Sequence, residues 1–148
     1  MRVDFAFGVP NRFRSSCFLI DKLYQAGRQL IVFHGDPRAL AHFDRLLWGF
    51  QPTAFIPHCL ADDPHAAHSP IVLCHEAKQI EAAQSVLQQA WLLNLDPDIP
   101  PVFPHSRRII EVVSTQPDCR TQGRNRWRTY QNQGFQLKAR ELNPQELE

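Results

Sequence analysis

The sequence predicts an α/β domain built around a mainly parallel sheet. Three observations lead to this fold class: the first 48 residues alternate twice between strand and helix patterns, the inner strand segment is short and almost wholly apolar, and turn residues separate the segments. Strands that alternate with helices favour parallel pairing through right-handed crossovers. The 148 residues, 43% of them hydrophobic, suit one domain with a substantial core. We therefore expect a single domain over residues 1–140 and a polar C-terminal tail over residues 141–148.

The first three elements follow directly from the pattern. A strand is expected at Val3–Gly8, where apolar and polar residues alternate. The segment Asn11–Ala26 has apolar residues at helical spacing, an N-cap candidate at its first position and Gly27 after its last turn. Gln29–His34 is a nearly continuous apolar run, which is typical of a strand buried on both faces.

A second helix is expected to begin at Asp36, with Pro37 in its first turn. Its predicted apolar face consists of Leu40, Phe43, Leu47 and Trp48. The later elements repeat the alternation, with strands at Ile71–His75, Trp91–Leu95 and Arg108–Val113, and helices at Glu76–Gln89 and Arg120–Gln133. The proline-rich stretches at 52–70 and 97–104 are expected to be connecting loops.

The glycines argue against a nucleotide cofactor. No two of the six fall within a G-x-G-x-x-G or G-x-x-x-x-G-K-[ST] window, so we predict no phosphate-binding glycine loop and no cofactor. The four cysteines lie far apart and are expected to be free thiols in a reducing cytoplasm. No apolar run approaches the roughly 18–20 residues of a membrane span, and the N-terminus lacks a signal-peptide pattern. We expect a cytoplasmic protein that contacts no membrane.

A small metal-dependent α/β enzyme is the main alternative. Six potential ligands fall within 18 residues: His58, Cys59, His65, His68, Cys74 and His75. A zinc site needs only three or four such groups. However, their spacing matches no compact Cys/His module. Pro57 directly precedes the stretch, and Pro64 and Pro70 interrupt it, so a solvated, His-bearing loop is the simpler interpretation. We expect no metal, and we find neither a nucleophile elbow nor any other credible catalytic set.

Charge is distributed unevenly along the chain. Residues 115–140 carry six basic residues against one acidic residue, a local charge of +5, whereas the whole chain has a net charge of +1. Trp127 and Tyr130 lie beside a basic stripe on the predicted last helix, where an apolar slot bordered by guanidinium groups would suit an anionic ligand with an aromatic or aliphatic end. The stripe consists of three arginines at intervals of four: Arg120, Arg124 and Arg128.

Two other interpretations of this helix stay open. In one, the aromatic side chains face the core and the arginines are merely solvated. In the other, arginines beside aromatic rings form a stacking surface for nucleic acid. A local charge of +5 on a chain of net charge +1 would bind nucleic acid weakly, and with a strong dependence on salt because the contacts with phosphates are ionic.

Several short strings resemble the chi subunit family of bacterial DNA polymerase III. Residues 45–48 read Arg-Leu-Leu-Trp and residues 55–60 read Phe-Ile-Pro-His-Cys-Leu, similar to the family pattern "LW…FxPH.L". The predicted strands at 91–95 and 108–113 resemble the family too. So does the ending, with Arg124-x-Arg126-Trp127-Arg128-x-Tyr130 followed by Gly134-Phe135. These landmarks occur in the family's order and span most of the chain, to about Leu137.

The resemblance implies a Rossmann-like, three-layer α/β fold and a non-catalytic accessory subunit of the clamp-loader complex in DNA replication. It also implies two partners. One is the psi subunit, and the other is the acidic C-terminal tail of single-stranded DNA-binding protein (SSB), which ends in Pro and Phe after several acids. Contact with DNA would then be only indirect. No psi-binding motif can be transferred residue by residue.

The resemblance also implies roles for individual residues. Arg124 matches the family's key basic residue and would hold the carboxylate of the SSB tail. Trp127 stands where the family usually has tyrosine, so an aromatic wall is kept and a hydroxyl is lost. Trp48 and Phe55 match apolar positions near the pocket, and His58 is expected to be structural. The full expected tail-binding set is Arg124, Trp127, Arg120, Arg128, Phe55 and Trp48.

Overall fold

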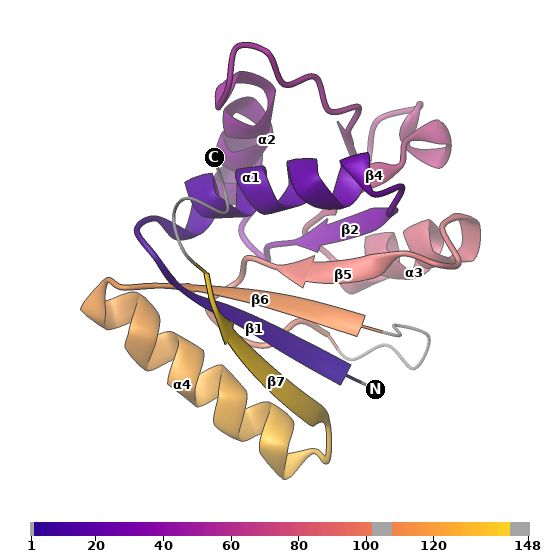
Figure 1. Cartoon of the computed structure of the whole chain (residues 1–148). Coiled ribbons are helices and arrows are strands. Elements are labelled where there is room, and N and C mark those ends of the chain that lie inside the picture. Colours follow the sequence, from indigo (N-terminus) through magenta and orange to yellow (C-terminus); the bar gives the residue numbers. More distant parts are fainter. Residues whose placement is uncertain (1, 102–107, 143–148) are drawn as a thin grey trace.

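The computed structural model describes residues 2–101 and 108–142, which form a seven-stranded sheet with helices on both faces (Figure 1). The strands are β1 (Arg2–Val9), β2 (Leu30–Phe33), β3 (Cys59–Leu60), β4 (Ile71–Cys74), β5 (Trp91–Asn94), β6 (Arg108–Ser114) and β7 (Gln136–Glu141). The helices are α1 (Arg12–Gln25), α2 (Pro37–Gly49), the 3₁₀ helix η1 (Ala66–His68), α3 (Ala77–Val86) and α4 (Pro117–Asn132).

The predicted fold class is confirmed. The strands lie in the order β3-β4-β2-β5-β6-β1-β7, and every strand pair among the described residues is parallel. Adjacent residues of the central strand β2 point to opposite faces: Ile31 and Phe33 enter one core cluster, Leu30 and Val32 the other. Helices α3 and α4 cover the first face, and α1 and α2 cover the second, so the molecule has three layers (Figure 1).

The helix starts follow the predicted capping chemistry. Oδ1 of Asn11 accepts a 3.0 Å hydrogen bond from the amide of Arg14, and Oδ1 of Asp36 accepts a 3.0 Å bond from the amide of Arg38. Gly27 follows α1 with φ of +82°, a conformation that favours glycine. The expected helix over 120–133 begins earlier, at Pro117, and the one over 76–89 ends earlier, at Val86.

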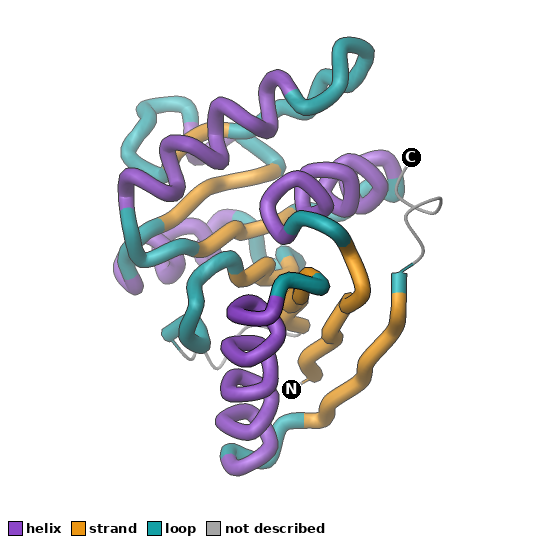
Figure 2. The backbone as a smooth tube through the Cα atoms, turned by 90° about the vertical axis from the view of Figure 1, so that its left-hand side faces the viewer, coloured by secondary structure: helices purple, strands orange, loops and turns teal. Residues whose placement is uncertain are grey.

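The C-terminal strand β7 was not expected from the sequence. After α4, Gly134 adopts φ of +82°, a conformation that favours glycine, and Phe135 packs against Tyr130 with ring centroids 5.4 Å apart. The chain then pairs in parallel with β1. Strand β7 is an outer strand of the sheet (Figure 2). Because its side chains are mostly exposed, its sequence lacks the apolar run that marks an inner strand.

The expected tail over 141–148 is only partly described. Glu141 belongs to β7, and the next residue, Leu142, is buried against Val9 and Val112. The other residues of that expected tail, 143–148, lie outside the described residues. The two-residue strand β3 was also missed, because the proline-rich stretch at 52–70 predicted only a loop. Within the described part of the chain, no helix is long and apolar enough to cross a membrane.

Candidate functional site

A pocket of about 570 Å³ lies between α4 and the strands β6, β1 and β7. Most of its lining comes from these four elements, including Phe5 and Phe7 of β1, Val113 of β6, Arg120, Arg124 and Trp127 of α4, and Ala139 and Glu141 of β7. Apolar side chains therefore form its floor, while two guanidinium groups border it on the α4 side. We refer to this cavity as the α4 pocket.

Close packing between α4 and β6 fixes one wall of the pocket. A Cβ atom added at Gly123 would lie 2.8 Å from Cγ2 of Val113, a separation that real Cβ atoms do not adopt. The absence of a side chain at position 123 thus lets α4 approach β6 at this point. The flanking residues Arg120, Arg124 and Trp127 are brought over the floor as a consequence.

The aromatic wall and the basic wall belong to the same helix. The half-buried ring of Trp127 packs edge-on against Phe5, with centroids 5.0 Å apart and an interplanar angle of 63°. Arg120 and Arg124 are exposed, and neither forms an ion pair with any described residue. Two positive charges therefore stand beside an apolar floor, which suits an anionic ligand with an apolar end.

One acidic side chain borders the same pocket. Glu141 lies at the end of β7 and packs over Gly8, where an added Cβ would come within 3.1 Å of Cγ of Glu141. Gly8 has φ of +84°, so this close passage uses both the conformational freedom and the missing side chain of glycine. The pocket thus has a basic side at α4 and an acidic side at β7.

The third arginine of the predicted stripe does not line the pocket. Residues four apart on an α-helix are offset by about 40°, because each turn contains about 3.6 residues. Arg128, eight residues after Arg120, is therefore offset from it by about 80° around the helix axis. Arg128 is exposed and does not line the pocket.

Tyr130 corrects part of the sequence prediction. One interpretation of the helix puts Tyr130 beside the slot and another puts it in the core. Tyr130 is only 1% exposed and lies in the core, as the second interpretation predicts. Its hydroxyl donates a 2.7 Å hydrogen bond to Oε2 of Glu111. Burial first, and then the neighbouring carboxylate of Glu111, raises the pKa of Tyr130 far above its ordinary value, so the hydroxyl stays protonated and donates. The apolar floor is supplied instead by Phe5, Phe7 and Val113.

Arg126 is one of the six basic residues counted in segment 115–140, but it lies in the interior. It is 2% exposed, and its Nε donates a 2.9 Å hydrogen bond to Oε1 of Glu111 while Nη1 donates to the carbonyl of Pro97. Its Nη2 has no hydrogen-bond partner among the described residues. The charge of +5 in segment 115–140 is therefore not all at the surface.

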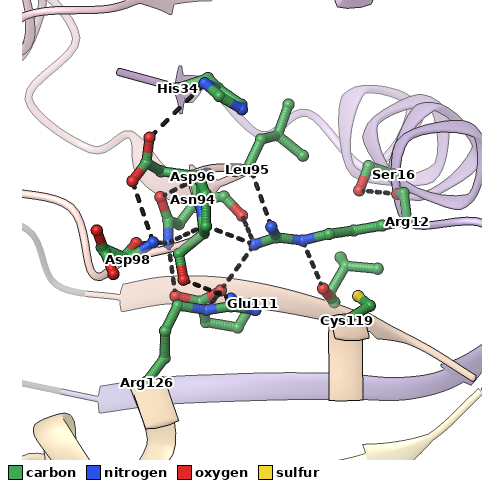
Figure 3. A network of polar contacts seen from close by, with 12 residues as sticks. Arg12, Ser16, His34, Asn94, Leu95, Asp96, Asp98, Glu111, Cys119 and Arg126 are labelled. Carbon is green, nitrogen blue, oxygen red and sulfur yellow. Dashed lines mark hydrogen bonds and ion pairs between the residues drawn. The ribbon is translucent and has the colours of Figure 1, made fainter. Parts of the chain in front are cut away.

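The carboxylate of Glu111 is the centre of a buried polar network (Figure 3). Nδ2 of Asn94 donates to Oε2 at 2.8 Å, and Nη2 of Arg12 donates to Oε1 at 3.3 Å. Arg12 also donates to the carbonyls of Leu95 and Val112, at the carboxyl ends of β5 and β6. Burial, followed by the charge of Arg126, lowers the pKa of Arg12 from its usual range. The network joins α1, β5, β6 and α4.

Sequence reasoning missed this network. The sequence predicts strands at the segments that contain Asn94 and Glu111, but it assigns no partner to either side chain. A polar residue inside an otherwise apolar strand is a recognisable sign of a buried partner. The network positions α4, and with it the basic wall of the α4 pocket, since Arg126 and Tyr130 both anchor that helix to β6.

Trp48 and Phe55 are not brought to the α4 pocket. They lie at the end of α2 and in the loop after it, and neither lines the α4 pocket. Their chain neighbours Leu47, Ala54 and Ile56 belong to the core cluster on the face of the sheet opposite α4, the face that α2 covers (Figure 1). Trp48 is 46% exposed and Phe55 is 74% exposed, with ring centroids 5.8 Å apart. The two residues form a separate exposed aromatic surface, which we call the α2 patch.

His58 supports the α2 patch from beneath. Its ring is buried, with Nδ1 2.7 Å from the carbonyl oxygen of Ile56 and Nε2 3.3 Å from Oδ1 of Asp44. Trp48 stacks on it with centroids 4.0 Å apart. These contacts give His58 the structural position that was expected for it.

The other potential metal ligands do not converge. No group of three or more His, Cys, Asp or Glu side chains within residues 2–101 and 108–142 is arranged to hold a metal ion. All four cysteines are free thiols. Burial raises the pKa of Cys17 and of Cys74 to about 12, so these two thiols are protonated at neutral pH.

Comparisons with known proteins agree with the strings noted in the sequence. The family model described as "DNA polymerase III chi subunit, HolC" matches residues 1–138. The DNA polymerase III subunit chi of Pseudomonas aeruginosa is 30% identical over 146 residues, which cover 95% of this chain and 96% of the relative. The protein of the same name from Haemophilus influenzae is 26% identical over 123 residues, or 82% of this chain and 81% of the relative. The chain therefore belongs to the DNA polymerase III chi subunit family, with an accessory role in DNA replication.

Proposed function

We propose that this protein is a non-catalytic, cytoplasmic subunit that links the clamp-loader complex to SSB by binding the acidic C-terminal tail of SSB, and that it pairs with the psi subunit. The observation that carries the proposal is the α4 pocket. There, the guanidinium groups of Arg120 and Arg124, which form no ion pair within the described part of the chain, stand beside a floor formed by Phe5, Phe7 and Val113.

The chemistry of the tail fits the two sides of this pocket. The terminal carboxylate would pair with Arg124 through charge-assisted hydrogen bonds, and the terminal Phe ring would lie on the apolar floor against Trp127. The preceding acids would pass Arg120 and stay away from Glu141. The basic and acidic sides of the pocket would thus orient the peptide.

The α2 patch supports the second half of the proposal. Trp48 and Phe55 form an exposed aromatic pair that lies on the other face of the sheet from the α4 pocket. Aromatic side chains of this kind are enriched in protein–protein contacts. We assign pairing with psi to the α2 patch, so that both partners could bind at once. This assignment takes Trp48 and Phe55 out of the expected tail-binding set.

Titration of a labelled SSB-tail peptide tests the tail pocket. We expect modest affinity for the wild type, because a short peptide must be ordered on docking. Arg124→Ala should weaken binding at least about tenfold, the loss typical of a charge-assisted contact worth about 1.5–3 kcal/mol. The matched control is Arg38→Ala, which removes an exposed arginine from α2 and should change nothing. Equal binding by Arg124→Ala and wild type would refute the proposal.

Co-purification with psi tests the second surface. The variant Phe55→Ala should lose psi while it keeps the affinity of wild type for the tail peptide, because Phe55 is 74% exposed and does not line the α4 pocket. Arg124→Ala should keep psi and lose affinity for the tail peptide. If Phe55→Ala retains psi and instead loses the peptide, then the separation of the two surfaces is wrong.

A further inference from the structure

A second groove lies on the other side of the outer strands from the α4 pocket. It has a volume of about 410 Å³ and runs between α1 and the strands β6, β1 and β7. Leu19 and Leu23 of α1 and Ile110 of β6 give it apolar walls. None of these three residues lines the α4 pocket. We call this cavity the α1 groove.

The alternation of side chains along β7 separates the two cavities. Glu141 lines the α4 pocket, whereas Lys138 and Arg140 line the α1 groove. Successive residues of a strand point to opposite faces, so the two basic residues of β7 face away from Arg124. They lie on the outermost strand of the sheet (Figure 2).

Further basic residues border the α1 groove at the starts of β1 and β6. Arg2 and Arg108 both line it, and both form ion pairs with Asp4, the acidic residue in its lining. Arg28 lies next to it. The guanidinium carbons of Arg28 and Arg108 are each 4.2 Å from the centroid of the Trp91 ring, which also lines the groove.

The groove is therefore strongly positive for a chain whose net charge is +1. Among the described residues, five basic side chains border it against one acidic side chain, a local charge of +4. Stacking on Trp91 holds two of the guanidinium groups in place, which reduces the conformational entropy that a ligand would have to overcome. A polyanion is the ligand that complements this surface.

We propose that the α1 groove binds the phosphate backbone of single-stranded DNA. The family to which the chain belongs works in DNA replication, so DNA is a polyanion that the protein meets. A single strand also exposes the faces of its bases, which can lie against apolar walls such as Leu19 and Leu23, whereas a duplex stacks those faces inside. This contact differs from the expectation that the protein touches DNA only indirectly, and it does not depend on the tail-binding proposal.

Fluorescence anisotropy with a labelled oligothymidylate at low salt tests the groove. The wild type should bind weakly. If about four phosphates are neutralised, the logarithm of the affinity should fall with the logarithm of the salt concentration with a slope of about −3. Lys138→Glu should weaken binding about fivefold or more and make the slope shallower by about 1. Lys78→Glu on α3 is the matched control, with the same change in net charge at an exposed position outside the groove.

Two further measurements separate DNA binding at the α1 groove from tail binding at the α4 pocket. Arg124→Ala should bind the oligonucleotide like wild type, and Lys138→Glu should bind the tail peptide like wild type. Failure of the DNA-binding proposal can therefore be distinguished from failure of the tail-binding proposal. Absence of binding at low salt, or equal weakening by Lys138→Glu and Lys78→Glu, would overturn the proposal. It would also be overturned if polyglutamate bound as well as the oligonucleotide and with the same dependence on Lys138, since the groove would then be a site for acidic peptides.

Discussion

The hydroxyl of Tyr130 donates a 2.7 Å hydrogen bond to Oε2 of Glu111, and this bond ties the helix that carries the basic wall to the centre of the sheet. Arg126, one turn earlier on α4, binds the other carboxylate oxygen through its Nε at 2.9 Å. The position of Arg124 over the α4 pocket thus depends on buried contacts made by its neighbours on the opposite side of the same helix.

Replacing the buried carboxylate should be costly. Glu111→Gln keeps the shape of the side chain but leaves the guanidinium groups of Arg12 and Arg126 without their shared counter-charge in a buried site. We expect a loss of about 3–5 kcal/mol in the free energy of unfolding, measured by denaturant titration. Glu81→Gln, at an exposed position of α3, should stay within about 0.5 kcal/mol of wild type. A loss below about 1 kcal/mol for Glu111→Gln would show that the network is not needed for stability.

The close approach of α4 to β6 predicts a specific steric effect. Gly123→Ala would place a Cβ 2.8 Å from Val113 and should destabilise the protein by about 1–3 kcal/mol, despite the better helix propensity of alanine. Tail-peptide affinity should fall as well, because α4 must shift. The control is Gly49→Ala in α2, where an added Cβ meets no atom within 4 Å.

A second substitution tests whether Val113 is the side chain that the added methyl group meets. Shortening this side chain in the double variant Gly123→Ala/Val113→Ala should restore part of the tail-peptide affinity that Gly123→Ala loses, because the clash is with Val113. Measured by the same peptide titration, an affinity no better than that of Gly123→Ala alone would contradict the packing argument.

The acidic side of the α4 pocket should restrain binding of an acidic peptide. Glu141 lines the pocket beside the proposed path of the tail, and removing its charge by Glu141→Gln should raise affinity about two- to fivefold, the range expected for one solvent-exposed charge. The gain should shrink at high salt. Glu76→Gln is the control in the same titration, because Glu76 is exposed and does not line the α4 pocket. A decrease in affinity for Glu141→Gln would show that Glu141 contributes a favourable contact instead.

His34 predicts a dependence of stability on pH. Burial lowers its pKa below the usual value near 6.5, and Nδ1 accepts a 3.0 Å hydrogen bond from the amide of Asp36, which a proton on that nitrogen would break. Two charged groups also face this ring: Asp96 raises the pKa of His34, and Arg12 lowers it. Because the unfolded chain then binds more protons than the folded chain, stability should fall as the pH drops below about 6.5.

Denaturant unfolding between pH 7 and pH 5 measures this effect. His34→Gln should reduce the loss of stability on acidification, and His68→Gln, at an exposed position of η1, should leave it unchanged. Identical pH dependence in wild type and His34→Gln would exclude His34 as the group responsible.

Much of the fold could be predicted because its inner parts have strong local patterns. The run at Leu30–Phe33, the N-caps at Asn11 and Asp36 and the glycine after α4 each specify one local structure. Strand β7 could not be predicted in the same way, since an outer strand with exposed side chains resembles a polar loop.

The candidate site was predictable only in part. Helical spacing correctly placed Arg120 and Arg124 near Trp127, because these residues lie within two turns of one helix. The same spacing could not reveal that Tyr130 and Arg126 point to Glu111, a partner on another element, nor that Trp48 and Phe55 lie across the sheet. Those relationships depend on the order of the strands, which local sequence does not contain.

The three tryptophans provide the most direct test, because each stands at a different surface. Trp127 lines the α4 pocket, Trp48 forms part of the α2 patch and Trp91 lines the α1 groove. The measurement is an NMR titration of ¹⁵N-labelled protein with the SSB-tail peptide, observed at the three indole N–H resonances and assigned by Trp→Phe variants. We predict that the chemical shift of the Trp127 resonance changes with added peptide and reaches a plateau, while the resonances of Trp48 and Trp91 do not shift. Movement of the Trp48 resonance with no change at Trp127 would contradict the assignment of the tail to the α4 pocket.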